Sequence, residues 1–151
     1  MTSFDHRSRG DHYDSAMMAY ASGNYGSSLK ILSRVLDIDP QFEMAYYIRG
    51  ASFYKTGQME RSVSALTKAI ELDPKDARFF HLRGVARERM CDYAGALADI
   101  NAALALDPTY AAALHSRARI HEKSGHPQLA LKDHESVINL IGKKPDGPVN
   151  G

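Results

Sequence analysis

Hydrophobic residues recur along this chain at helical intervals, in paired segments that are separated by turn-forming residues. Residues 43–56, EMAYYIRGASFYKT, place apolar or small side chains on one helical face at Ala45, Tyr46, Gly50, Phe53 and Tyr54. Residues 59–72, MERSVSALTKAIEL, repeat the pattern with Val63, Leu66, Ala69, Ile70 and Leu72. Gly57-Gln58 separates the segments and Asp73-Pro74 follows the second. The pattern predicts two helices joined by a tight turn.

The pattern returns every 34 residues, and Pro40, Pro74 and Pro108 each follow a helical segment at this interval. Aligning the chain with itself at that spacing gives two positions that are aliphatic throughout: Leu29, Val63, Leu97 and Leu131, and Leu36, Ile70, Leu104 and Ile138. Two other positions are small throughout: Ala16, Gly50, Gly84 and Ala118, and Ser28, Ser62, Ala96 and Ala130. These matches indicate four tandem units, 9–42, 43–76, 77–110 and 111–144, each a pair of helices.

Two features of the repeat have physical reasons. Proline restricts the residue before it and cannot continue the helical hydrogen-bond ladder, so each Asp-Pro is expected to end the second helix of a unit. Small residues such as Gly50 and Ser62 allow two helix backbones to approach closely.

With this period and these positions, the units resemble tetratricopeptide repeats. Residues 9–144 take part, but unit four departs from the pattern at Pro127, His134 and Gly142, and the chain has no tryptophan. The resemblance implies an all-α, right-handed superhelical array of helical hairpins, an α-solenoid. It also implies a non-enzymatic interaction scaffold, which binds a peptide segment or helix of another protein in a concave groove lined by the first helices.

Family positions that face the groove carry two kinds of side chain here. Units one and two supply mainly tyrosine and methionine: Tyr13, Met17, Tyr20, Met44, Tyr47, Tyr54 and also Lys55. Units three and four supply charged residues and histidines: Arg78, His81, Glu88, Arg89, His115, Arg119, Glu122 and Lys123. A ligand with an apolar stretch and an acidic end would suit both halves. The alternative is that the aromatic residues only pack between helices and the charges are solvated.

A chaperone-binding subclass of the family holds a C-terminal carboxylate with a lysine–asparagine–arginine clamp. Only Arg78 fits among the matching positions, which are Tyr13, Met17, Ile48, Arg78 and Leu82. We therefore expect no recognition of chaperone tails.

Arginines and aspartates share aligned positions in units three and four, at Arg83, Asp99, Arg117 and Asp133. The planar guanidinium suits a carboxylate in a bidentate pair. A structural ion pair is the favoured interpretation, either Arg83–Asp99 within a unit or Arg117–Asp99 across units. A site for a charged ligand is the alternative.

Charge and motifs argue against other classes of function. Nineteen basic and eighteen acidic residues are interspersed and give a net charge of +1, so nothing attracts nucleic acid or an anionic membrane surface as a whole. The sequence has no phosphate-binding loop, glycine-rich fingerprint or serine nucleophile motif. We expect no enzymatic activity, no cofactor, no nucleic-acid partner and no membrane partner.

The histidines and the single cysteine are the remaining candidates for chemistry. His81 and His115 share an aligned position on neighbouring first helices, but no third ligand is evident, so no metal site is predicted. His121 and His134 fall at core positions of unit four and are expected to hydrogen-bond each other. Cys91 replaces the turn glycine of the other units, and a small turn residue is favoured over a redox switch.

The two ends differ from the repeats. Residues 1–10 are predicted to be flexible, and they carry no apolar run of the kind that a signal peptide needs. A single cysteine excludes an internal disulfide framework, which fits a reducing compartment. The expected location is therefore cytoplasmic. Residues 145–151 are predicted to be a disordered tail. The last helix then lacks a neighbour, which exposes Leu129, Val137, Leu140 and Ile141. Such a strip favours a partner, so a homodimer or docking within a larger assembly is the alternative function.

Overall fold

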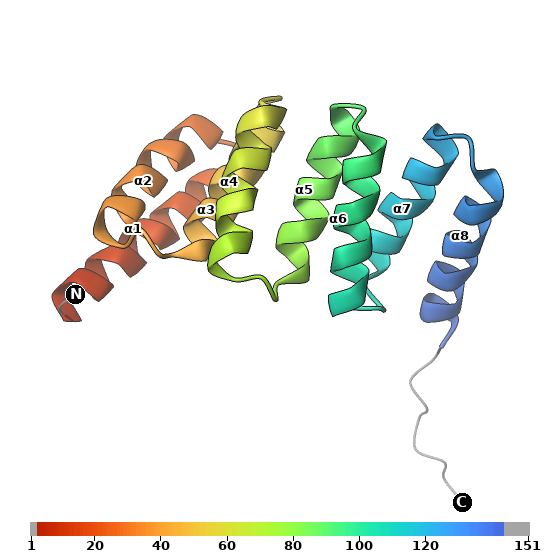
Figure 1. The fold of residues 1–151 in the computed structure, drawn as a ribbon. Coiled ribbons are helices and arrows are strands. Elements are labelled where there is room, and N and C mark those ends of the chain that lie inside the picture. Colours follow the sequence, from red (N-terminus) through yellow and green to blue (C-terminus); the bar gives the residue numbers. More distant parts are fainter. Residues whose placement is uncertain (1–2, 144–151) are drawn as a thin grey trace, which may run out of the picture.

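The computed structural model describes residues 3–143, which form eight α-helices and no strand (Figure 1). The helices are α1 (Ser3–Ala21), α2 (Tyr25–Ile38), α3 (Glu43–Lys55), α4 (Met59–Leu72), α5 (Ala77–Arg89), α6 (Tyr93–Leu106), α7 (Ala111–Lys123) and α8 (Pro127–Gly142). Helices α3, α5 and α7 begin 34 residues apart, as do α4, α6 and α8. The helical hairpins therefore follow the period that the hydrophobic pattern predicts.

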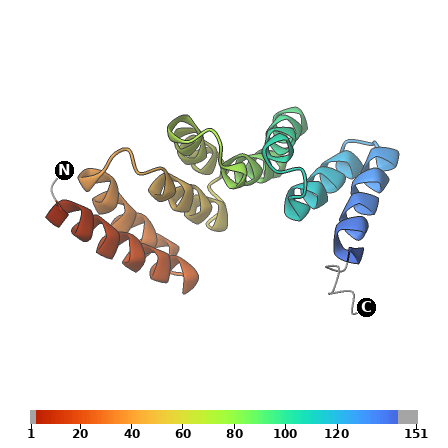
Figure 2. The same cartoon turned by 90° about the horizontal axis from the view of Figure 1, so that it is seen from below.

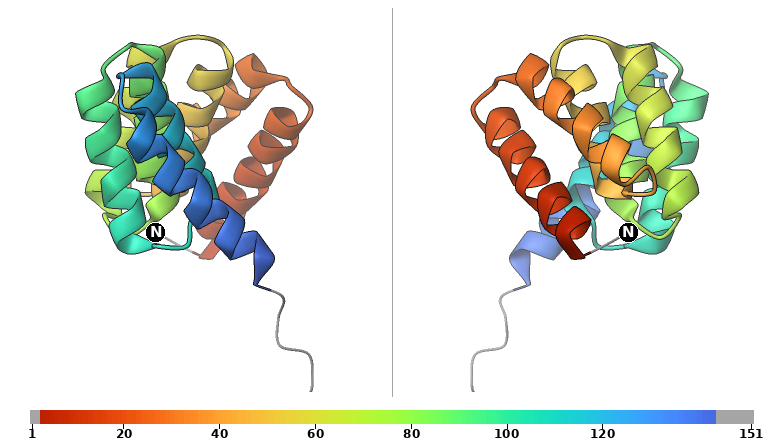
Figure 3. Two further views of the ribbon diagram at one scale, coloured as in Figure 1. Left: turned by 90° about the vertical axis from the view of Figure 1, so that its right-hand side faces the viewer. Right: turned by 90° about the vertical axis from the view of Figure 1, so that its left-hand side faces the viewer.

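The hairpins stack in chain order into an extended array (Figure 2). Each helix packs against the helix before it and the helix after it, and the first helices α1, α3, α5 and α7 also contact one another. The second helices make no such contact with one another within residues 3–143. The first helices thus form the inner, concave layer. Viewed from either end, successive hairpins are rotated relative to one another (Figure 3).

The start of the chain differs from the prediction of a flexible segment over residues 1–10. Helix α1 begins at Ser3, so the described part of this segment is helical. Arg9 ties it to the first hairpin: its Nη1 donates to Asp39 Oδ2 at 2.6 Å, and its guanidinium lies 4.5 Å from the centre of the Phe42 ring. Residues 1–2 and 144–151, including the predicted tail 145–151, lie outside the described residues.

Small residues bring the two helices of a hairpin together, as expected. The Ser62 hydroxyl donates to the Gly50 carbonyl at 2.8 Å, and Ser28 donates to Ala16 in the same way at 2.9 Å. A Cβ atom on Gly50 would lie only 2.7 Å from Leu66 Cγ. The Leu66 side chain therefore packs directly against the backbone of Gly50, which leaves no room for a larger residue without rearrangement.

The Asp-Pro pairs end α2, α4 and α6, and the aspartate contributes as well as the proline. Asp39, Asp73 and Asp107 have φ near −138° and ψ of 91–96°, the extended conformation that a following proline requires. Oδ1 of each accepts the backbone N–H two residues on, at 3.0–3.1 Å. This turn fixes the path of the chain into the next unit.

The turn inside each hairpin needs a left-handed residue. Gly23, Gly57 and Gly125 supply it with φ of 79–83°, and Cys91 adopts φ of 60° at the same position. The core runs through the array as a series of buried apolar residues, from Leu32 and Val35 through Leu66 and Phe79 to Ile100 and Ile120. None of the described helices is both long enough and apolar enough to cross a membrane.

Candidate functional site

The candidate site is the concave layer of first helices, and its N-terminal half is aromatic. Tyr13 meets Phe42 edge to face with ring centres 4.9 Å apart, and Tyr47 lies 5.2 Å from the buried Phe79. Tyr20 meets Tyr25 in the same way at 5.4 Å. These tyrosines and Met17 are half-buried. They pack between helices and keep part of their surface exposed to solvent.

Burial also affects the hydroxyl groups of this half. Loss of hydration raises the pKa of Tyr13, Tyr20 and Tyr47 above the usual value of 10.0. These groups therefore stay neutral over the physiological range, and the aromatic half offers hydrogen-bonding hydroxyls and no charge of its own. Tyr54 closes this half, with the Arg89 guanidinium 5.1 Å from its ring centre.

The C-terminal half is organised around one buried carboxylate. Glu88, on α5, is only 4% exposed. Arg119, on α7, donates from Nε and Nη2 to its two oxygens at 2.7 Å each, and Lys123 Nζ lies 3.0 Å from Oε1. From the sequence, Glu88 was predicted to be a charged groove residue, with a solvated charge as the alternative. The structure instead makes it the group that joins α5 to α7.

Electrostatics explain why Glu88 stays ionised. Burial is the largest influence and favours the neutral acid, but the hydrogen bonds and charges of Arg119 and Lys123 together outweigh it and lower the pKa of Glu88. The same contact raises the pKa of Arg119. A buried carboxylate with two cations is fully ionised at neutral pH.

The cationic side chains of this half are partly offset by carboxylates within the protein. Arg78 pairs with Asp76 at 2.6 Å, and the hydrogen bond from Arg78 lowers the pKa of Asp76. Arg89 has no ion pair within the described part of the chain. The uncompensated charge is therefore concentrated at the last turns of α5 and α7, away from Arg78.

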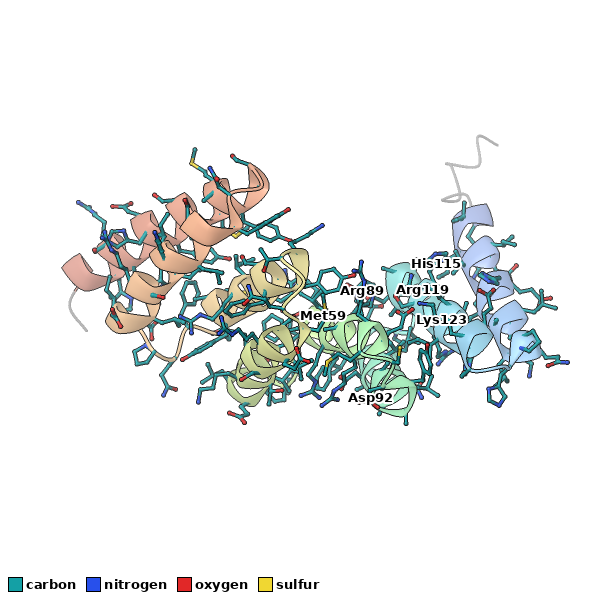
Figure 4. All side chains as sticks on the ribbon, turned by 90° about the horizontal axis from the view of Figure 1, so that it is seen from above. Met59, Arg89, Asp92, His115, Arg119 and Lys123 are labelled. Atoms are coloured by element: carbon teal, nitrogen blue, oxygen red, sulfur yellow. The ribbon has the colours of Figure 1, made fainter. Side chains whose placement is uncertain are left out.

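A pocket of about 320 Å³ opens at those last turns, lined by Tyr54, Val85, Glu88, Arg89, Arg119 and Lys123. The side chains of Arg89, Arg119 and Lys123 gather there from the two helices (Figure 4). Five of these residues, all but Val85, were predicted singly as groove residues, whereas the pocket itself was not predicted. The available signal was spacing: Glu88 and Arg119 are 31 residues apart, near one repeat period, which places them on neighbouring first helices.

The histidines are held by neighbours. His81 lies between the Ser116 hydroxyl, 3.0 Å from Nε2, and the Tyr110 hydroxyl, 3.2 Å from Nδ1. Burial, followed by the charge of Arg119, lowers the pKa of His81 below 6.5. Exposed His115 lies 6.2 Å from His134, measured between ring centres. Among the side chains that the structure describes, from residue 6 to residue 143, no three of His, Cys, Asp or Glu are placed to share a metal ion.

The predicted hydrogen bond between His121 and His134 is wrong. His134 Nε2 lies 3.0 Å from Glu122 Oε1, while the His121 ring faces His126 with centres 6.4 Å apart. Neither histidine is fully buried. Only His134 stands at a position that is core in earlier units, where the aligned Leu66 and Ile100 are fully buried.

The arginine–aspartate pairs form within units. Arg83 donates to both oxygens of Asp99 at 2.9 and 2.7 Å, and Arg117 does the same to Asp133. Arg87 adds a third contact to Asp99 at 2.9 Å. Both aspartates are at most 4% exposed, so the pairs are held inside the hairpins.

The C-terminal end differs from the predicted strip in its members. Ile141 and Leu129 are 78% and 43% exposed, but Val137 and Leu140 pack against the core. Two unpredicted residues, Leu131 and Ile138, are 58% and 66% exposed. The repeat explains them, since Leu97 and Leu104 at the aligned positions pack within the core cluster. The sequence alignment already contained this signal.

Helix α1 differs from α3 in the polarity of two aligned positions. Asp11 and Asp14 are exposed on α1. Their aligned positions one unit later are Ala45 and Ile48, which are 0% and 4% exposed against the preceding hairpin. Unit one thus has exposed acidic side chains at positions that are apolar and buried in unit two.

Comparison with known proteins agrees with this architecture. The model of the ETO1 C-terminal domain matches residues 13–140. The chain belongs to this family. The hairpins of this ETO1 C-terminal domain member are tetratricopeptide repeats. No curated protein sequence matches it.

Three solved structures show the shared fold. MamA 41-end from Desulfovibrio magneticus RS-1 has a TM-score of 0.84 and 21% identity, covering 92% of this chain and 78% of that one. The Arabidopsis OM64 TPR domain has a TM-score of 0.76 and 22% identity, covering 79% and 98%. The second TPR of Spaghetti (RPAP3) bound to the HSP90 peptide SRMEEVD has a TM-score of 0.63 and 28% identity, covering 65% and 91%.

Proposed function

We propose that this protein is a non-enzymatic interaction module that binds a peptide segment or helix of another protein along the layer of first helices. The observation that carries the proposal is the composition of that layer, in which half-buried aromatic rings lead to an uncompensated cation at Arg89. The second TPR of Spaghetti, which has the same fold, was solved with a peptide bound. Its peptide supports this mode of binding and does not identify the partner.

The two halves of the layer have separate roles in this proposal. The rings and thioether of the first half contact an apolar stretch of the ligand, and its groove residues are Tyr13, Met17, Tyr20, Tyr47 and Tyr54. The second half contributes the groove residues Arg78, His81, Arg89, His115, Arg119 and Lys123, and an acidic group of the ligand binds there at the uncompensated Arg89. A few well-packed anchors supply most of the affinity in such interfaces.

The internal ion pairs decide which substitutions test the proposal. Replacing Arg119 would leave the buried Glu88 short of a partner and would destabilise the fold as well as the surface. Arg89 is exposed and half-buried Tyr54 lies beside it, so Tyr54→Ala/Arg89→Ala changes the inner face with less damage. Leu131→Ser/Ile138→Ser changes the exposed C-terminal end and serves as the matched control.

The experiment is capture of partners from a lysate of the source organism on the wild type and both variants, with mass spectrometry. Thermal unfolding by circular dichroism establishes that each variant is folded. The proposal predicts a protein that binds the wild type and the C-terminal variant and is lost from Tyr54→Ala/Arg89→Ala. Retention by the inner-face variant would contradict it.

Self-association through the C-terminal end is the second candidate function. It is favoured by the exposure of Leu131, Ile138 and Ile141 on α8. Light scattering at high protein concentration tests it: a dimer that becomes a monomer in Leu131→Ser/Ile138→Ser supports it. A strict monomer in the wild type rules it out.

A further inference from the structure

The pocket at the last turns of α5 and α7 holds more positive than negative charge. Three cationic side chains, Arg89, Arg119 and Lys123, line it with one carboxylate, Glu88. At neutral pH these groups sum to an excess of two positive charges, because Glu88 is ionised. The lowered pKa of His81, to which the Arg119 charge contributes, is consistent with that excess.

Arg89 is the cation that remains available. Arg119 and Lys123 both point to Glu88, whereas Arg89 is exposed and lies over the Tyr54 ring. The ring restrains the guanidinium without neutralising it. Tyr54 gives the pocket an aromatic wall, and Val85 gives it an aliphatic one.

We propose that this pocket is a carboxylate-binding subsite, in which Arg89, with the Lys123 charge beside it, receives an acidic group of the bound partner. Glu88 shows that the cations here hold a carboxylate at 2.7 Å with both oxygens engaged. The partner's carboxylate pairs with the cation that Glu88 leaves unused. An apolar side chain next to it in the partner packs on Tyr54 and Val85.

This subsite gives the groove a direction. It lies at the C-terminal ends of α5 and α7, whereas Arg78 at the start of α5 is already paired with Asp76. The acidic group of the partner therefore binds at the Arg89 end of the inner face. The inference rests on the proposed function, and the test below separates the two.

The experiment uses short peptides and the full ¹⁵N-labelled chain. N-acetyl-Phe-Glu-amide and its neutral match N-acetyl-Phe-Gln-amide are titrated at constant ionic strength, and backbone amide shifts are followed by NMR. A third peptide, N-acetyl-Phe-Gln with a free C-terminus, distinguishes a chain terminus from an acidic side chain as the source of the carboxylate. Arg89→Gln removes the cation, and Lys30→Gln, an exposed cation on α2, is the charge-matched control.

We expect the acidic peptides to shift amides near Arg89 and Lys123, and the neutral peptide to bind roughly fivefold more weakly. Arg89→Gln should remove that preference and Lys30→Gln should keep it. Equal binding of the acidic and neutral peptides, or an unchanged preference in Arg89→Gln, would overturn the subsite. If the peptides show no such preference but partner capture is still lost in Tyr54→Ala/Arg89→Ala, the proposed groove binding is kept and only the carboxylate subsite is rejected.

Discussion

Units two (43–76) and three (77–110) have the same backbone plan but different polar chemistry. Both have a glycine at the close helix contact and a hairpin ended by Asp-Pro. At one aligned position, however, unit two has Ala65 and unit three has Asp99. Arg83 therefore forms a buried bidentate pair, while the aligned Arg49 only meets the Ser33 hydroxyl at 3.4 Å.

The difference shows which positions the fold constrains. Helix ends, turns and close contacts are fixed by backbone geometry and are the same in both units. Side chains that do not set the geometry vary, as with Tyr47 against His81 and Ala65 against Asp99. On the first helices, charged side chains and histidines are more numerous in α5 and α7 than in α3, although the backbone plan is the same.

The largest effect is expected from Asp99→Ala, which gives unit three the residue of unit two. It leaves Arg83 and Arg87 without their carboxylate inside the hairpin, so the free energy of unfolding should fall by about 3 kcal/mol. Urea unfolding measures it. The reverse change, Ala65→Asp, offers Arg49 a partner and should alter stability by less than about 1 kcal/mol. If Asp99→Ala and Ala65→Asp lowered the free energy of unfolding equally, the two aligned positions would not be comparable.

A smaller difference is expected between Gly84→Ala and Gly50→Ala. The new Cβ at Gly84 would meet Ile100 Cδ1 at 2.9 Å and the Ala96 carbonyl at 3.1 Å, and the carbonyl cannot move without α6. We expect a loss of about 2 kcal/mol for Gly84→Ala in thermal unfolding.

At Gly50 the three atoms nearest to a new Cβ, at 2.7–3.4 Å, all belong to the Leu66 side chain and none to the backbone. Unit one already combines alanine and leucine at these positions, Ala16 and Leu32, with both fully buried. Since alanine also favours the helix, Gly50→Ala should be close to neutral. A larger loss at Gly50 than at Gly84 would contradict this explanation.

The third difference is in pH dependence. His81 has a lowered pKa, so as the pH falls below about 6.5 the unfolded chain takes up this proton before the folded chain does. Stability should decline below that pH, and His81→Gln should reduce the decline, measured by urea unfolding at pH 7.5 and 5.5. Some decline should persist, because the pKa of His121 is also lowered by burial. Tyr47, aligned with His81, has a raised pKa and does not titrate in this window.

The smallest effect is expected at the hairpin turn. Cys91 adopts a left-handed conformation that costs a residue with a Cβ about 1 kcal/mol. Cys91→Gly should therefore raise the free energy of unfolding by about 0.5–1 kcal/mol, and Gly57→Ala in unit two should lower it by about 1 kcal/mol. If Cys91→Gly instead lowers the free energy of unfolding, the Cys91 side chain makes a stabilising contribution larger than the cost of its left-handed conformation.

The repeat made most of the fold predictable. The 34-residue period located the helix pairs, and the glycines and Asp-Pro pairs located their ends, because these depend on local backbone chemistry. The helical start at Ser3 was missed because its support, Arg9 with Asp39, joins residues 30 apart. The same limit applied to Glu88, whose burial by Arg119 and Lys123 requires two neighbouring helices to be placed together.

The central claim is that the inner layer of first helices binds the partner. Amide hydrogen exchange of the chain, alone and with the captured partner, tests it most directly. Slower exchange in α3, α5 and α7, greatest near Tyr54 and Arg89, is the result that this account predicts. Protection confined to α8, around Leu131 and Ile138, would contradict this claim and would assign binding to the C-terminal end.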